Sequence, residues 1–115
     1  MTLLRATKEN VLKLIERRMD EFQELIDAQR TYGFHDSKKS SLTQCEATLN
    51  HLRETICLMV PEHIAPTKEN FLKLIEKSIE EWKYTPTHSA YVANDVIAEL
   101  KCVATTLRIH YKEEK

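Results

Sequence analysis

Apolar residues recur along the chain in four separate runs, at alternating spacings of three and four residues. This spacing puts the apolar side chains of an α-helix on one face, and it is typical of helices that pack nearly parallel to their neighbours. The runs therefore predict four amphipathic helices. Their core-facing stripes are Leu12, Ile15, Met19, Phe22 and Ile26; Leu42, Cys45, Leu49, Leu52, Ile56 and Met59; Leu72, Ile75, Ile79 and Trp82; and Ala93, Val96, Leu100, Val103, Leu107 and His110.

The ends of the predicted helices are marked by capping and breaking residues. Thr7 and Thr67 precede the first and third runs, where a threonine hydroxyl can accept a hydrogen bond from a free backbone N–H. We expect the first helix to end near 29–32, before Gly33, and the third to end near Tyr84. Pro61 ends the second helix. The candidate caps are Asp36, Ser37, Ser40 or Ser41 for the second helix and Thr87 or Ser89 for the fourth.

The chain contains an internal repeat. Residues 67–76 are identical to residues 7–16 at nine of ten positions, and the stripe of the fourth helix matches that of the second when it is shifted by 51 residues. The first helices of the two copies are 60 residues apart in the sequence, and their second helices are 51 residues apart. We therefore expect the connection in the first copy to be nine residues longer. A repeat of this kind defines the architecture. The sequence predicts an all-α, antiparallel up-down-up-down four-helix bundle of two tandemly duplicated helical hairpins, about 7–60 and 67–112, in one domain, 1–115.

Five apolar residues lie beside the main stripes and widen the apolar faces of the first and third helices. Two explanations fit them: a core broader than a strict seam, which we expect, or a subunit interface in a homodimer. These residues are Val11, Leu14, Leu25, Phe71 and Leu74. Outside the helices, we expect Leu3 and Leu4 to pack against the bundle end and the charged tail from 112 to 115 to fray.

Composition favours helices and excludes several functional classes. The 115 residues include one glycine and three prolines, which leaves little material for tight turns. The net charge of −1 creates no overall attraction to nucleic acid, and Lys38-Lys39 is the only adjacent lysine pair. The sequence shows neither a signal-peptide pattern nor an apolar run of membrane-spanning length, so we expect a cytoplasmic protein.

Residues that commonly carry chemistry do not form a recognisable catalytic or metal motif. Three cysteines without CxxC spacing predict neither a disulfide framework nor a zinc site: Cys45 falls on a core stripe, and Cys57 and Cys102 fall at helix flanks. Glu80, Glu81, Asp95 and Glu99 only approximate the acidic pairs of the all-α nucleotide pyrophosphatases, because the Glu-x-x-Glu and Glu-x-x-Asp spacings are missing. No metal, cofactor or catalytic residue is predicted.

The connection between the first two helices concentrates arginine and aromatic residues. It contains Arg30, Tyr32, Phe34 and His35, residue types that often anchor protein interfaces. Arg30 to His35 also resembles, in spacing, the Arg-x4-His signature of the HEPN ribonucleases, which are small helical bundles. That resemblance implies RNA cleavage by an Arg and a His at a dimer interface. Thr31 and Gly33 depart from the family pattern. As a further alternative, Tyr32 and Phe34 fold back and cover the end of the bundle.

Taken together, the sequence predicts a small protein-binding module without catalysis, which acts as a regulator, adaptor or inhibitor of another protein. The predicted contact residues are Arg30, Tyr32, Phe34 and His35. The alternatives are a HEPN-like metal-independent ribonuclease that uses Arg30 and His35, and a structural subunit that forms a homodimer.

Overall fold

The computed structural model describes residues 3–32, 36–59, 64–84 and 90–113, and only the backbone of residues 29–32, 36–40 and 90–91. Four helices make up most of this chain: α1 (Lys8–Tyr32), α2 (Asp36–Cys57), α3 (Lys68–Lys83) and α4 (Ala90–His110). Two short strands, β1 (Leu4–Arg5) and β2 (Tyr111–Lys112), lie outside them. The all-α class that the apolar spacing predicts is therefore confirmed.

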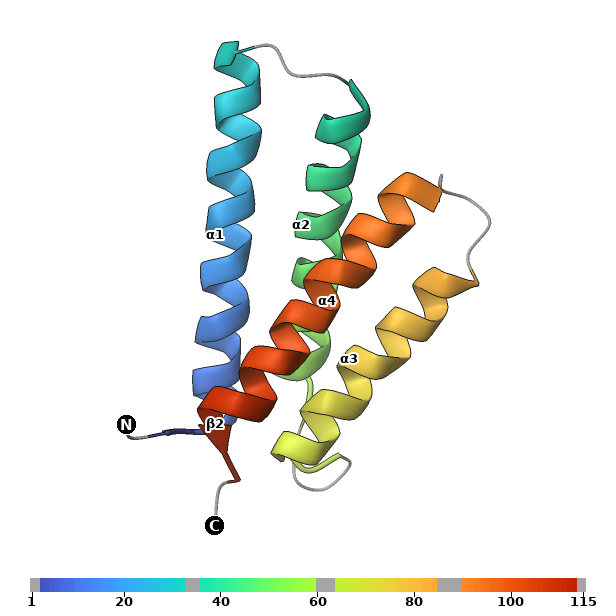
Figure 1. Ribbon diagram of the computed structural model, residues 1–115. Coiled ribbons are helices and arrows are strands. Elements are labelled where there is room, and N and C mark those ends of the chain that lie inside the picture. The colour runs from blue at the N-terminus through green and yellow to red at the C-terminus, as the bar shows by residue number, and fades with distance from the viewer. Residues whose placement is uncertain (1–2, 33–35, 60–63, 85–89, 114–115) are drawn as a thin grey trace.

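The helices are arranged as two pairs. α1 lies along α2 and α3 lies along α4, and the pairs meet mainly through α2 and α4 (Figure 1). The α3–α4 pair is tilted relative to the α1–α2 pair. The ends of α1 and α2 that lead into their connection project well beyond the neighbouring end of α4 (Figure 1). One end of the molecule is thus formed by two helices instead of four.

Buried apolar residues from all four helices form one continuous core. Leu49, Ile75 and Leu100 are at most 1 % exposed, and Leu12 packs against them from the side. The largest fully buried side chain is Phe71 of α3. The four stripes therefore share a single interior, as their spacing predicts.

The core includes residues that lie beside the predicted stripes, and some stripe residues are less buried than these neighbours. Val11 and Phe71 are fully buried, whereas their stripe neighbours Leu12 and Leu72 are only partly buried. The prediction of a wide core is thus confirmed for these helices, with one exception. Leu25 is 48 % exposed, because it lies on the outer face of α1.

The repeated Thr-Lys-Glu-Asn segments start α1 and α3 with the same hydrogen bonds. The Thr7 hydroxyl accepts from the Asn10 backbone N–H at 3.1 Å, and the Thr67 hydroxyl accepts from that of Asn70 at 3.2 Å. Each asparagine amide then donates to the backbone carbonyl five residues earlier, at Arg5 or Ala65. Both predicted threonine caps are confirmed.

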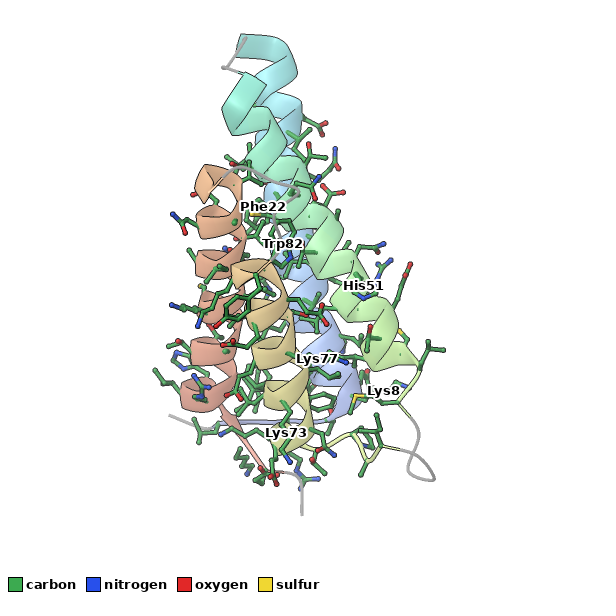
Figure 2. The ribbon with its side chains drawn as sticks, turned by 90° about the vertical axis from the view of Figure 1, so that its right-hand side faces the viewer. Lys8, Phe22, His51, Lys73, Lys77 and Trp82 are labelled. Carbon is green, nitrogen blue, oxygen red and sulfur yellow. The ribbon has the colours of Figure 1, made fainter. Side chains whose placement is uncertain are left out.

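The lysine of each segment binds the end of the neighbouring helix. Lys8 Nζ donates to the carbonyls of Cys57 and Met59 at 2.7 and 3.1 Å, at the end of α2 (Figure 2). Lys68 Nζ donates to the carbonyls of Arg108 and Tyr111 at 3.0 and 2.7 Å, at the end of α4. The last carbonyls of a helix lack partners within it and carry partial negative charge, so each ammonium neutralises a helix end.

Replacing one of these lysines should cost more than removing a surface charge. For Lys8→Ala we expect a loss of about 1–1.5 kcal/mol in the free energy of unfolding, because two charge-assisted hydrogen bonds disappear at a partly buried position. Chemical denaturation followed by circular dichroism measures it. The control is Lys13→Ala, which removes only the exposed ion pair with Glu9 and should cost about 0.2–0.5 kcal/mol. Equal losses would contradict the role given to Lys8.

The two ends of the chain pair with each other, which the sequence did not predict. β1 and β2 are parallel, with Leu4 opposite Tyr111 and Arg5 opposite Lys112, and the Ala6 N–H donates to the Lys112 carbonyl at 2.8 Å. Lys112 is therefore held in place, and the expectation of a frayed tail is wrong at this residue. At the same end, Tyr111 is buried while His110 is exposed, so the helix stripe ends at Leu107.

The lead-in segment also differs from its prediction. Leu3 and Leu4 are 39 % and 54 % exposed, and Ala6 is the residue that enters the core. Backbone pairing with β2 explains this, because it fixes the direction of the segment and leaves the leucines at the surface. The ends are thus held both by backbone hydrogen bonds and by the buried residues Ala6 and Tyr111.

Candidate functional site

The predicted contact segment lies at the projecting end of the α1–α2 pair. Arg30 and Tyr32 belong to the last turn of α1, where the backbone alone is described, and Phe34 and His35 lie outside the described residues. The predicted end of the first helix, before Gly33, is confirmed. The second helix begins at Asp36, so all four of its candidate caps lie inside the helix and that prediction is wrong.

The projection begins where α4 first meets the other pair. Asp95, in the second turn of α4, lines one cavity together with Phe22 of α1 and Leu42 of α2. Beyond this level α1 and α2 extend side by side past α4 (Figures 1 and 2). Half-exposed Leu25 lies about two turns before the end of α1. An apolar side chain is therefore available to a partner next to the predicted contact segment.

A second hollow, which we call the α1–α2 groove, is lined by these two helices alone. Its volume is about 480 Å³. One oxygen of the Glu46 carboxylate is buried beside this groove without a hydrogen-bond partner. The lining residues are Met19, Gln23, Ile26, Thr43, Glu46, Ala47 and Asn50.

An arginine–carboxylate pair joins the two helix pairs below the projection. Arg18 of α1 donates from Nε and Nη2 to the two oxygens of Glu99 in α4, both at 2.6 Å, and from Nη1 to Glu21 at 2.7 Å. Glu99 is only 8 % exposed. The hydrogen bonds to Glu99 raise the pKa of the Arg18 guanidinium, so it stays charged under all ordinary conditions. The guanidinium also lies over the Phe22 ring, 5.8 Å from its centre.

Next to this pair is a cavity of about 290 Å³, which we call the interhelical cavity. Its walls come from α1, α2 and α4 and are mostly apolar. Ser41 is part of the lining, and its hydroxyl is buried without a hydrogen-bond partner. The lining residues are Phe22, Ser41, Leu42, Cys45, Asp95, Ala98 and Glu99.

Sequence reasoning did not identify Arg18 and Glu99, although a signal was present. Glu99 lies three residues after Val96 and four before Val103, which puts it on the core face of α4. Arg18 occupies the equivalent place between Ile15 and Phe22. Opposite charges at core-facing positions of two helices indicate a buried pair. Glu99 is thus a structural partner of Arg18, and Glu80, grouped with it in the pyrophosphatase comparison, pairs with Lys83 instead.

The three cysteines differ in exposure. Cys45 is buried in the interhelical cavity wall, as its stripe position predicts, and burial raises the pKa of its thiol to about 12. Cys57 and Cys102 are exposed. At pH 8 the Cys45 side chain is therefore in its unreactive thiol form.

Thiol labelling tests this difference. With an aromatic disulfide reagent at about pH 8, we expect two thiols to react in the folded protein and all three after denaturation. The Cys45→Ala variant should react as the unchanged protein does when folded, and it should gain nothing on unfolding. Rapid labelling of three thiols in the folded protein would show that Cys45 is not shielded.

Two properties of the described residues bear on function. No three His, Cys, Asp or Glu side chains among them gather closely enough to hold a metal ion. Over the same residues, none of the helices has the length and apolar character needed to cross a membrane.

Comparison of the chain with models of known protein families, with curated proteins and with solved structures found no match in any of the three.

Proposed function

We propose that the chain is a tandem duplication of one antiparallel helix pair, with its four helices running up-down-up-down. The repeated segments support this because they make the same contacts in both copies. Thr7 and Thr67 cap their helices alike, and Lys8 and Lys68 each bind the end of the helix that follows. A lysine at the start of one helix reaches the end of the next only if the two run in opposite directions.

We further propose that the protein is a non-enzymatic binding module for another protein in the cytoplasm, as a regulator, adaptor or inhibitor. The observation that carries this proposal is the projection of α1 and α2 beyond α4 (Figure 1). The prediction that the first connection is nine residues longer is wrong, because the additional residues lengthen the helix at this end: α1 has 25 residues and α3 has 16. In a duplicated module, the feature that distinguishes one copy is the natural place for a function of its own.

The chemistry of the projecting end suits a protein partner. Leu25 is an exposed apolar side chain of the projecting part of α1, and the nearby α1–α2 groove combines apolar residues such as Ile26 with polar ones such as Gln23. Arg30, Tyr32, Phe34 and His35 add the residue types that dominate binding energy at interfaces. We propose these four as the main contact residues.

Affinity capture from source cells, followed by mass spectrometry, tests the proposal. The double variant Tyr32→Ala/Phe34→Ala should lose the captured partner while its helical circular dichroism is unchanged. The matched control, Leu58→Ala/Ile64→Ala, removes two exposed apolar side chains far from the projecting end and should keep the partner. If both double variants capture the same protein equally well, the contact site is elsewhere.

Two other outcomes would replace this proposal. Cleavage of labelled RNA that disappears in both Arg30→Ala and His35→Ala would favour the ribonuclease alternative. A molecular mass that doubles with concentration, with no other protein captured, would favour a structural homodimer. Light scattering over a range of concentrations measures the latter.

A further inference from the structure

The interhelical cavity has the dimensions of a site for a small organic molecule. Its volume of about 290 Å³ is near the lower limit for ligand pockets in proteins, and roughly twice that of an engineered cavity that holds benzene. Phe22, Leu42 and Ala98 supply apolar wall from three different helices. The cavity thus suits a compact ligand with an apolar body.

The polar groups of the cavity require a ligand that donates hydrogen bonds. Ser41 is 4 % exposed and its hydroxyl oxygen has no partner, which is unfavourable for a buried polar group. The other two polar side chains in the lining, Asp95 and Glu99, are carboxylates. Ionised carboxylates only accept hydrogen bonds, so the three groups together favour a donor.

The charges around the cavity favour a cation. Among the described side chains, Arg18 is the positive group beside it, and its hydrogen bonds go to Glu99 and Glu21. Asp95 makes no ion pair with any described side chain, and it adds a third carboxylate to the surroundings of one guanidinium. Glu99 is buried next to apolar wall, where a charge is screened less than in open water, and Asp95 is exposed.

We propose that the interhelical cavity binds a small primary ammonium ion carrying a short apolar body. The ammonium group binds the Asp95 carboxylate and the Ser41 hydroxyl, and the apolar body lies against Phe22, Leu42 and Ala98. Burial of an otherwise unpartnered hydroxyl distinguishes this cavity from the α1–α2 groove, where the orphaned atom belongs to Glu46. The proposal is independent of the protein-binding function.

Titration with three probes, butylammonium, benzylammonium and 2-phenylethylammonium, tests the proposal by nuclear magnetic resonance. At millimolar concentration at least one should cause saturable shifts of the Ser41, Cys45, Asp95 and Ala98 amides. The neutral analogue of the best probe, with hydroxyl in place of ammonium, should bind about five- to tenfold more weakly because the ion pair with Asp95 is absent. Absence of saturable shifts with all three probes overturns the proposal.

Three variants locate the site. Asp95→Asn, at an exposed position, should weaken the best ammonium probe to the level of its neutral analogue. Ala98→Leu should fill the cavity and abolish binding of both. The matched control is Ala47→Leu, because Ala47 corresponds to Ala98 under the 51-residue offset but lines the α1–α2 groove. Equal binding by Asp95→Asn and the unchanged protein, or loss of binding only in Ala47→Leu, would overturn the assignment.

Discussion

The Phe71→Ala variant should lose about 3–5 kcal/mol in the free energy of unfolding, the largest effect expected from one substitution in this chain. Phe71 is fully buried in the common core, so removing its ring leaves a cavity that the surrounding helices cannot fill. Small domains are stable by about 5–15 kcal/mol in total, and the variant would lose a large part of that. Guanidinium denaturation followed by circular dichroism measures the loss.

Leu72→Ala is the matched control for this prediction. Leu72 is the next residue of α3 and belongs to the stripe identified from spacing, but it is only partly buried. We expect its truncation to cost about 1 kcal/mol, since less apolar surface leaves water at this position. A loss as large for Leu72→Ala as for Phe71→Ala would mean that the stripe marks the core axis after all.

The Arg18→Met variant should lose about 2–3 kcal/mol, because it leaves the Glu99 carboxylate buried without its partner. Breaking a fully buried ion pair typically costs 3–5 kcal/mol. Arg18 is 29 % exposed, so water partly compensates, and we expect the smaller value. Methionine keeps the unbranched stem, which separates the loss of charge from the loss of packing. The same denaturation experiment measures it.

Two further variants show whether the pair itself stabilises the fold. Arg108→Met breaks an ion pair with Glu76 in which both side chains are about half exposed, and it should cost less than 1 kcal/mol. The double variant Arg18→Met/Glu99→Leu removes both charges and should come within about 1 kcal/mol of the unchanged protein. A double variant as unstable as Arg18→Met would show that Glu99 is not the source of the penalty.

The candidate sites differ in how far the sequence revealed them. The contact segment around Arg30 was found from its composition and its extra length, and its side chains lie outside the described part of the structure. The interhelical cavity was not predicted. Ser41 and Glu99 belong to different helices, and the sequence of neither helix specifies how closely the two pack. The spacing of Glu99 places a carboxylate on the core face of α4. It indicates a buried ion pair only once Arg18 is known to lie opposite.

The sequence by itself determined the four helices, the threonine caps of α1 and α3, and the repeated segment. These features depend on side-chain periodicity and on hydrogen bonds within a few residues, which local sequence specifies. Tertiary structure decided that Phe71 lies deeper than Leu72, that Arg18 meets Glu99, and that Tyr111 pairs with the start of the chain. Each of these depends on how elements distant in the sequence pack against one another, which no single segment of the sequence specifies.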